Sequence, residues 1–528
     1  MGTPARDFRS FFEDAVSAVP ERPYLIWTGD DSQTSYADMD LHINRAANAW
    51  LELGVRPGDR VSFMLDNSPD FMAAWLGLAK IGAVLVAINT GFKQQEAAYL
   101  VSDSESVLVL TSGAYLPLLR DLATTLPHVR SVLTLEPVEG QGCFTQALAA
   151  ADPTPPAAHP SPDSLMSLIY TSGTTGNPKG VMQTQENFVL TGQSYPHWMG
   201  MADGDRIYAC LPLFHINSQA YSSMGAIGAR GSLVLAPRFS ASRFWPEVRR
   251  HRVNAFNYIG AMTAILSKKE ISDDDQDHEV KVAYGVPALA HETRLALEER
   301  FGLTIVSGFG MSETTFGLAE SIDGERRPGS MGTPRHHPDP EVRRTEARIV
   351  DDAGRVVSPG TPGELLLRNA AMMRGYFNDP VRTEEALDSD GWLHTGDNAW
   401  MDAEGYFYFL DRKKDIVRRR GENISSLEVE RVIERHPDVL EAAVVGVPSE
   451  LTDEEVLAYV VVRPGGDLVP ADVVAWCAEH IASFKVPRYV EFTTDLPKTP
   501  TAKIQKTKLR GLDAGPDRYD HVLASRPS

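Results

Sequence analysis

Cysteine is scarce in this 528-residue sequence, which contains only Cys143, Cys210 and Cys477. They are far apart and have neither the pairing of a disulfide framework nor the spacing of a metal site, so neither is expected. The longest apolar stretch, residues 75–88, is interrupted by Lys80 and is shorter than the roughly 20 residues of a membrane span. The N-terminus has no apolar signal core, and a cytoplasmic protein is expected.

Basic residues are also few relative to acidic ones. The sequence has 51 Lys and Arg against 71 Asp and Glu, a formal net charge of -20. A surface that binds nucleic acid must neutralise phosphates, so no nucleic-acid partner is expected. With 43% hydrophobic residues, the chain can bury more than one core, and its length implies at least two domains.

A loop rich in hydroxyls and glycines is the most informative segment that is present. It follows the apolar run Leu168–Tyr170 and ends in Pro178-Lys179-Gly180. Glycines let such a backbone curl until its N–H groups form an anion nest, which the hydroxyl donors complete. The pattern differs from the P-loop because no Ser or Thr follows Lys179 to hold magnesium. The phosphate-binding residues that it predicts are Thr171, Ser172, Gly173, Thr174, Thr175, Gly176 and Lys179.

The rest of the chain alternates between strand-like and helix-like segments, which predicts parallel sheet covered by helices. After residue 360 short strands and turns indicate a small β-barrel, and a compact α/β unit follows residue 415. We place the domain boundary at residues 411–415. Strands are expected at 61–65, 107–110, 231–235, 255–258, 363–368, 405–410, 441–445 and 456–462, and helices at 43–53, 242–250, 291–301, 426–435 and 470–481.

Six further motifs follow the loop in order: Leu211–His215, Gly308–Glu313, Gly391–Asp397, Asp411–Asp415, Gly421–Ser425 and Pro500–Lys503. Together with residues 170–180 they resemble the adenylate-forming superfamily of acyl-CoA synthetases, aryl-CoA ligases, luciferases and peptide-synthetase adenylation domains. Residues 214–217 and 419–425 look most like the carnitine/crotonobetaine–CoA ligase branch. The resemblance implies an N-terminal α/β domain, 1–411, of two stacked mixed sheets with helices and a small β-barrel. A small mobile α+β lid, 412–528, is implied to follow.

The resemblance also implies residues for the phosphates and the metal. A carboxylate that attacks the α-phosphate of ATP brings two anions together, so cations and Mg²⁺ are required. Glu313 is implied to hold Mg²⁺, whose preference for oxygen ligands fits one carboxylate and substrate phosphates. Thr171 is expected as a second metal ligand, Ser312 near the α-phosphate, and Lys179 with the phosphate loop.

The nucleoside has its own implied residues. By resemblance, the Asp397 carboxylate accepts both ribose hydroxyls, assisted by Arg412. Adenine is expected between Gly285-Val286-Pro287 and Phe309, which follows Gly308. The sequence here departs from the commoner Gly-Gly-Ala-Pro pattern and leaves the individual adenine contacts open.

The C-terminal domain is implied to change the site between two half-reactions. Lys503 resembles the mobile lysine that bridges carboxylate and α-phosphate, although a surface lysine like its neighbours Lys498, Lys506 and Lys508 is the alternative. Lys414 occupies the hinge position. In the second half-reaction, Arg420 and Gly421 would approach coenzyme A. The phosphates of coenzyme A suit the arginines of residues 418–420. The alternative is that these arginines form a solvated loop.

The acid pocket is implied around His215, which matches the family's aromatic gate residue. Asn217, Gln219 and Tyr258 are candidate polar groups of this pocket. They would suit an acid with a polar or aromatic tail better than one with a long alkyl chain.

The expected activity is that of an ATP- and Mg²⁺-dependent acid:CoA ligase that forms an acyl-adenylate, releases pyrophosphate and makes a thioester with coenzyme A. Three alternatives stay open. The acceptor could be an amine or a carrier protein, the enzyme could adenylate nitrite to diazotise an aryl amine, or the chain could bind nucleotide without catalysis. The sequence identifies neither the acid nor the oligomeric state, monomer or homodimer.

Overall fold

The computed structural model divides the chain into two compact units. The first unit comprises residues 1–90, 100–170 and 180–411, and the second comprises 91–99, 171–179 and 412–528. The two short segments join the second unit although they lie early in the chain, so domains of 1–411 and 412–528 remain a prediction. The residues described are 6–171, 177–267, 269–286, 289, 291–351, 353–412, 416–449, 454–497, 504, 506–510, 512, 515 and 517–524.

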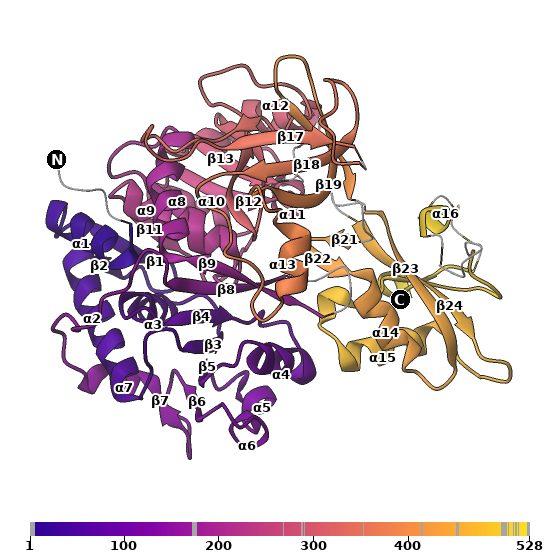
Figure 1. The fold of residues 1–528 in the computed structure, drawn as a ribbon, viewed down its shortest axis with the longest axis horizontal. Coiled ribbons are helices and arrows are strands. Elements are labelled where there is room, and N and C mark those ends of the chain that lie inside the picture. The colour runs from indigo at the N-terminus through magenta and orange to yellow at the C-terminus, as the bar shows by residue number, and fades with distance from the viewer. Residues whose placement is uncertain are drawn as a thin grey trace. The chain divides into compact units, whose positions relative to one another are not determined.

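A nine-stranded mixed sheet is the larger of the two sheets that dominate the first unit (Figure 1). Its six central strands run parallel, and antiparallel pairing occurs only at the edges, between β1 and β2, β14 and β15, and β15 and β16. In spatial order the strands are β16 (Thr333–Pro334), β15 (Thr314–Ala319), β14 (Thr304–Met311), β13 (Val282–Val286), β12 (Ala255–Ile259), β10 (Arg206–Ala209), β11 (Ser232–Leu235), β1 (Pro23–Trp27) and β2 (Gln33–Ser35).

A seven-stranded sheet carries the strands on either side of the predicted phosphate loop. Strands β3 to β8 pair in parallel, as the β-branched runs separated by helical segments predict. The order is β7 (Gly142–Cys143), β6 (Ser131–Thr134), β5 (Leu108–Thr111), β3 (Arg60–Met64), β4 (Val84–Ala87), β8 (Leu165–Thr171) and β9 (Lys179–Thr184).

Helices bury their apolar faces against both sheets. One core joins residues of the two sheets to those of α1, α2, α3 and α8, and a second core packs α10 and α12 on the nine-stranded sheet. Ser68 caps α3 by accepting from Phe71 N at 3.0 Å, ahead of a proline at the first helical position. The helices are α1 (Phe8–Ala18), α2 (Tyr36–Glu52), α3 (Pro69–Lys80), α4 (Gln94–Asp103), α5 (Leu116–Leu119), α6 (Leu122–Thr125), α7 (Phe144–Ala150), α8 (Gln185–Trp198), η1 (Asn217–Ser223), α9 (Met224–Gly228), α10 (Phe244–Arg250), α11 (Gly260–Ser267), η2 (Asp273–Gln276), α12 (His291–Phe301) and α13 (Pro380–Ala386).

The segment predicted as a small β-barrel forms a four-stranded sheet. Its order is β17 (Glu346–Val350), β18 (Gly363–Arg368), β19 (Leu393–Met401) and β20 (Phe407–Arg412). Leu365, Leu367 and Ala399 pack there against Phe309 and Leu318 of the nine-stranded sheet. This shared core fixes β19, which carries Asp397, relative to β14.

The second unit has a separate α+β core. The buried faces of β23 and β24 pack against α14 and α15. Its elements are β21 (Ile416–Arg419), β22 (Glu422–Ser425), α14 (Ser426–Glu434), β23 (Val439–Pro448), β24 (Glu454–Val462), α15 (Pro470–His480), η3 (Ser483–Lys485), β25 (Tyr489–Phe492), α16 (Lys506–Arg510), β26 (Tyr519–Asp520) and α17 (His521–Ala524).

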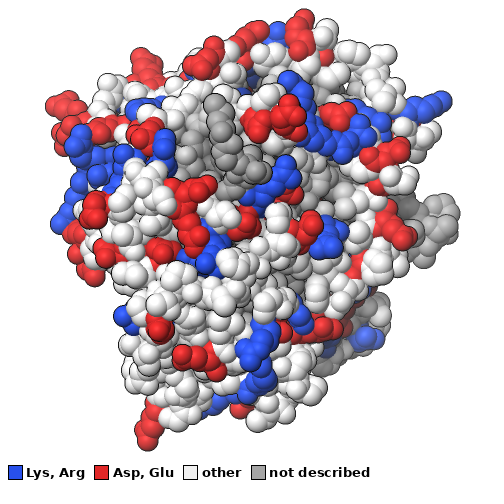
Figure 2. Space-filling view, turned by 60° about the vertical axis from the view of Figure 1, so that its left-hand side comes forward, with Lys and Arg blue, Asp and Glu red and all other residues white. Residues whose placement is uncertain are grey.

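The predicted fold class is confirmed: mixed sheets with helices and a small sheet are followed by an α+β unit. Within the described residues, no helix combines the length and the apolar character needed to cross a membrane. On the face drawn in Figure 2, acidic and basic side chains are interspersed.

A buried ion pair links α12 to the end of β15. Arg294 Nη1 lies 2.7 Å from Glu320 Oε1, and the two side chains are 6% and 1% exposed. Removing one charge leaves the other buried without compensation, so Glu320→Gln is expected to lower the free energy of unfolding by about 3–5 kcal/mol. The measurement is the urea midpoint by intrinsic fluorescence. Glu292→Gln, at an exposed position of the same helix, is the control, and equal midpoints for the two variants would contradict the prediction.

Candidate active site

Three of the predicted motifs follow neighbouring strands of the nine-stranded sheet. Strands β10, β12, β13 and β14 are parallel neighbours. Because the carboxyl ends of parallel strands meet at one edge of a sheet, where α/β proteins bind ligands, the residues after them converge. Leu211–His215 follows β10, Val286 ends β13, and Gly308–Glu313 spans the end of β14.

An apolar cluster joins two of these motifs to a further one. Ile216, next to His215, and Met311, next to Ser312, pack in one cluster with Tyr376 and Leu393. Leu393 belongs to the Gly391–Asp397 motif. The first unit therefore brings His215, Glu313 and the strand of Asp397 together.

Glu313 is held by a residue that the sequence did not indicate. Its side chain is buried, 5% exposed, and Tyr376 donates its hydroxyl to Glu313 Oε1 at 2.8 Å. Met373 N donates to the Glu313 carbonyl at 2.7 Å. Burial and the Glu313 carboxylate raise the pKa of Tyr376 well above its ordinary value. Tyr376 is therefore a neutral donor that orients this carboxylate.

Amide side chains hold the turn at Ser312 through hydrogen bonds. Gln183 Nε2 donates to the Ser312 carbonyl at 2.5 Å, and Asn187 Nδ2 donates to Gln183 Oε1 at 2.7 Å. Asn187 also donates to the Met372 carbonyl at 2.8 Å. This chain of hydrogen bonds fixes the backbone of the motif, and sequence spacing gave no signal for it because its members are about 130 residues apart.

His215 lies two residues before a π-helical segment, η1, a feature that often marks functional sites. Its backbone N–H donates to the Pro212 carbonyl at 3.1 Å, and its ring, which is half-buried, contacts the Phe214 ring with centroids 4.7 Å apart. Asn217, the first residue of η1, has its Oδ1 buried with no hydrogen-bond partner among the described residues. His215 and Asn217 therefore remain candidates for the acid pocket.

Gln219 has a different role from the predicted one. It is fully buried, and its Nε2 donates to the Leu213 carbonyl at 2.7 Å. Ser167 Oγ donates to its Oε1 at 3.0 Å. Both ends of the amide are used within the fold, so Gln219 holds the His215 segment in place instead of facing a pocket.

Tyrosine rings pack closely against the glycines of the β13 and β14 motifs. A Cβ at Gly285 would lie 2.5 Å from the Tyr258 ring, and one at Gly308 would lie 2.8 Å from the Tyr284 ring. Glycine is required at both positions because any side chain would displace a buried ring. Tyr258, a predicted pocket residue, is 1% exposed and supports β13 from within the fold.

The predicted adenine residues lie on the neighbouring strands β13 and β14, and the ribose residue Asp397 lies in the small four-stranded sheet. Phe309 is 8% exposed and packs in the core shared with the small sheet, while Val286 is half-buried at the end of β13. Asp397 in β19 is 3% exposed. Its N–H donates to Thr395 Oγ1 at 3.1 Å, and the preceding Gly396 has φ +70°, which glycine adopts readily. Arg412 ends β20, and Pro287 lies outside the described residues.

Within the second unit, Thr171 and Lys179 begin and end the predicted phosphate loop. They close β8 and open β9, which are neighbouring strands. Thr171 Oγ1 is buried and has no hydrogen-bond partner in the described part of the chain, a condition that suits contact with a ligand. Ser172, Gly173, Thr174, Thr175 and Gly176 lie outside the described residues, as do Lys414 and Lys503.

The arginine run at 418–420 divides into structural and exposed members. Arg419 is buried, and its Nη1 donates to the carbonyls of Phe484 and Val486 at 3.0 and 2.8 Å. Arg420 and Gly421 form the two-residue turn between β21 and β22, with φ +51° and +82°. Arg420 thus adopts a left-handed conformation that costs a non-glycine residue about 1–2 kcal/mol, and its side chain is 57% exposed. Because Arg420 is strained and exposed, it is a better candidate for contacting a ligand than Arg419.

The Mg²⁺ predicted at Glu313 would have few protein ligands. Among the described residues, no group of three or more His, Cys, Asp or Glu side chains could hold a metal ion. Glu313 supplies one buried, oriented carboxylate. This fits Mg²⁺, which keeps several waters and binds through one or two carboxylates and substrate phosphates.

Comparisons with known proteins identify the family of this chain. The pattern of the AMP-binding enzyme family matches residues 12–377, and that of the AMP-binding enzyme C-terminal domain matches residues 428–503. A crotonobetaine/carnitine–CoA ligase of Salmonella arizonae is 34% identical over 518 residues, covering 95% of this chain and 98% of its own. The predicted resemblance to that branch is confirmed.

Solved structures cover nearly the whole chain. The amide bond synthetase McbA from Marinactinospora thermotolerans has a TM-score of 0.85 at 26% identity and covers 96% of this chain and 99% of its own. A variant of o-succinylbenzoate–CoA synthetase from Bacillus subtilis has a TM-score of 0.83 at 26% identity, covering 97% and 99%. The chain belongs to the AMP-binding enzyme family and is an ATP-dependent adenylate-forming ligase.

Proposed function

We propose that this ligase joins a carboxylic acid to coenzyme A through an acyl-adenylate. The observation that carries the proposal is the 34% identity, over 95% of the chain, to a ligase whose acceptor is coenzyme A. The buried Glu313 carboxylate and the Asp397 strand at one edge of the site support the adenylation step.

In the first half-reaction, a carboxylate oxygen of the acid attacks the α-phosphorus of ATP, and the bond to the β-phosphate breaks. Mg²⁺ held by Glu313 would neutralise the phosphates, with the Thr171 hydroxyl as a further ligand. Lys503 would bridge carboxylate and α-phosphate, near Ser312. Lys179 and the loop Ser172–Gly176 would grip the pyrophosphate that leaves.

In the second half-reaction, the coenzyme A thiolate attacks the acyl carbon and AMP leaves. Arg420 and Gly421 would approach coenzyme A after rotation about Lys414. Asp397 with Arg412 would hold the ribose, and Gly285, Val286, Pro287, Gly308 and Phe309 would surround the adenine. Asn217 and His215 would contact the acid.

A second candidate keeps the adenylate but replaces the acceptor by an amine. The likeness to an amide bond synthetase, with a TM-score of 0.85, favours it over other acceptors. In this case the amine nitrogen attacks the acyl carbon, and an amide forms in place of the thioester.

The two candidates are distinguished by acid-dependent pyrophosphate release with coenzyme A, with a panel of amines, and with neither. The panel of acids should include aliphatic, aryl, amino-aryl and betaine acids, since carnitine itself is a betaine. We expect multiple turnovers only with coenzyme A, together with an acyl-CoA product. If turnover requires an amine and does not depend on coenzyme A, the second candidate is correct and the proposal is wrong.

Asp397→Asn tests the nucleotide part of the site. The amide retains the shape of the carboxylate but loses its charge, so hydrogen bonds from the ribose hydroxyls weaken by about 1–2 kcal/mol. We expect the KM for ATP to rise by roughly 5- to 30-fold. Asp390→Asn, at an exposed position just before the same motif, is the control. An unchanged KM in Asp397→Asn would remove Asp397 from the ribose site.

A further inference from the structure

Arg335 is a residue that neither the motifs nor the proposed reaction uses. It follows β16, and its N–H donates to the Gly317 carbonyl at 3.0 Å. Thr345 Oγ1 donates to the Arg335 carbonyl. The backbone of Arg335 is therefore hydrogen-bonded on both sides, next to the strand that returns from the Gly308–Glu313 motif.

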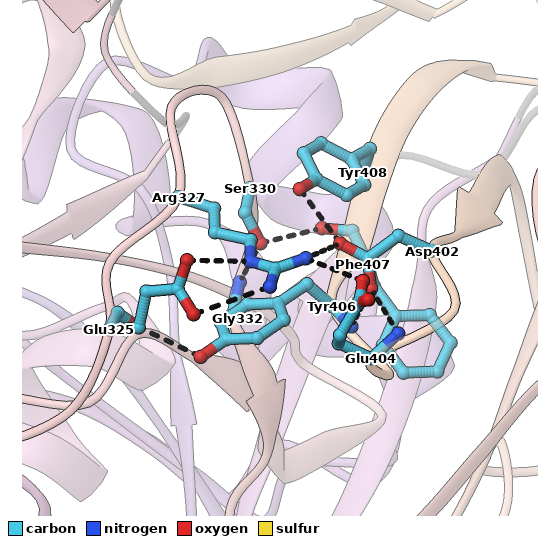
Figure 3. A network of polar contacts seen from close by, with 9 residues as sticks. All are labelled: Glu325, Arg327, Ser330, Gly332, Asp402, Glu404, Tyr406, Phe407 and Tyr408. Carbon is cyan, nitrogen blue, oxygen red and sulfur yellow. Dashed lines mark hydrogen bonds and ion pairs between the residues drawn. The ribbon is translucent and has the colours of Figure 1, made fainter.

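The loop before β16 is anchored by a polar network (Figure 3). Arg327 Nη1 pairs with Asp402 Oδ2 at 2.6 Å, and Ser330 Oγ donates to the Phe407 carbonyl at 3.1 Å. Phe407 N donates to the Gly332 carbonyl at 3.0 Å. Since β16 begins directly after Gly332, these bonds hold the strand and the arginine that follows it in one position.

The guanidinium of Arg335 has unused donors. Its Nε and Nη2 atoms are buried and find no hydrogen-bond partner among the described residues. A buried donor without a partner is costly, and more so when it is charged. Burial lowers the pKa of Arg335 to about 10, so the group is still protonated at neutral pH. A hydrogen-bond acceptor from outside the protein would remove this cost.

The acidic neighbour Glu320 offsets this cation only in part. Glu320 is the acidic neighbour that interacts with Arg335, but its Oε1 pairs with Arg294 and its Oε2 accepts from Ser307 N at 2.9 Å. Burial raises the pKa of Tyr284 to about 12, so Tyr284 is neutral. Arg294, Glu320 and Arg335 together carry one net positive charge, which favours an anion.

Tyrosine rings link Arg335 to η1, the element that also carries the proposed acid residue Asn217. Arg335 interacts electrostatically with Tyr284, whose ring packs on Gly308. The neighbouring Tyr221 has its ring centroid 5.7 Å from that of Tyr284, and its hydroxyl faces Gly310. Tyr221 belongs to η1, as Asn217 does, so tyrosines connect the proposed acid pocket with Arg335.

We propose that Arg335 binds a second anionic group on the acid, so that the substrate is a dicarboxylate and not a quaternary ammonium acid. This inference rests on the proposed function for the location of the acid. Two parallel N–H donors match the two oxygens of a carboxylate, and the charge is paired on binding. A trimethylammonium group would instead meet an uncompensated like charge.

The test compares acids of equal length that differ only at the far end. Dicarboxylates of four to eight carbons and terephthalate are set against the corresponding monocarboxylates and p-toluate, with carnitine as the cationic acid. We expect one dicarboxylate to exceed its neutral partner by about 100-fold or more in kcat/KM, because neutral acids leave the arginine unpaired. Arg335→Gln should abolish this preference, while lowering the rate with the neutral acid by less than threefold. Arg335→Lys should retain part of the preference.

Binding measured by calorimetry separates failure of this inference from failure of the proposed function. An unhydrolysed ATP analogue should bind Arg335→Gln with unchanged affinity, which shows that the variant is folded. If no acid is converted but dicarboxylates bind more tightly than neutral acids, the proposed reaction is wrong and the arginine site stands. The arginine site is overturned if the wild-type enzyme prefers neutral acids or carnitine. It is also overturned if Arg335→Gln weakens the binding of all acids equally.

Discussion

Glu313→Gln is expected to lower acid-dependent pyrophosphate release by about 100- to 1,000-fold. Glutamine can still accept the 2.8 Å hydrogen bond from Tyr376, so the fold around position 313 should persist. The charge that we propose binds Mg²⁺ is lost, and the Mg²⁺ concentration needed for half-maximal rate should rise. Release of pyrophosphate over a Mg²⁺ titration at saturating ATP measures both effects.

Two further variants define what Glu313 does. Tyr376→Phe removes the donor and keeps the carboxylate, so a smaller loss of about 10-fold is expected, with a modest rise in the Mg²⁺ requirement. Glu341→Gln, at an exposed position, should leave the rate unchanged. If Glu313→Gln lowers the rate at every Mg²⁺ concentration without changing the half-maximal value, Glu313 is not a metal ligand.

Lys503→Ala should cause the other large loss, at least about 1,000-fold in adenylation. The reason is that a cation between the carboxylate and the α-phosphate offsets repulsion between the two anions. Binding of ATP is expected to persist, because the phosphate loop and Asp397 are unaltered. Formation of acyl-AMP in the absence of coenzyme A, followed by rapid quench, measures this step alone.

The matched control for this variant comes from the same tail. Lys508 is exposed in α16, so Lys508→Ala should be active. Lys506 is unsuitable because its Nζ donates to Ser426 Oγ at 2.7 Å and pairs with Glu430 at 2.6 Å. Synthetic acyl-AMP should still react with coenzyme A in Lys503→Ala. Wild-type adenylation by this variant would remove Lys503 from the mechanism.

Local sequence patterns were sufficient for most elements of the fold. Helix 291–301 and strand 363–368 have the predicted bounds. The strand predicted at 441–445 extends to 439–448, because pairing with β24 stabilises residues whose own pattern is weak. Such extensions depend on the partner strand and are not encoded locally.

The motif residues could be found from the sequence, but the residues that position them could not. Tyr376 and Gln183 contact the Gly308–Glu313 motif only through the tertiary fold, and Asn187 holds Gln183 in place. Arg419 and Arg420 are residues of the same type in one run, yet Arg419 is buried in the paired strands and Arg420 is exposed in the turn. Burial and hydrogen-bond partners, which sequence spacing does not report, decide these roles.

The path of the carboxylate oxygens tests the central claim most directly. With an acid labelled with ¹⁸O in both carboxylate positions, ATP and coenzyme A, attack on the α-phosphorus transfers one labelled oxygen to AMP and leaves the other in the thioester. Mass spectrometry should therefore find one ¹⁸O in AMP and one in the acyl-CoA. Unlabelled AMP, or label in orthophosphate, would contradict an acyl-adenylate route to a thioester.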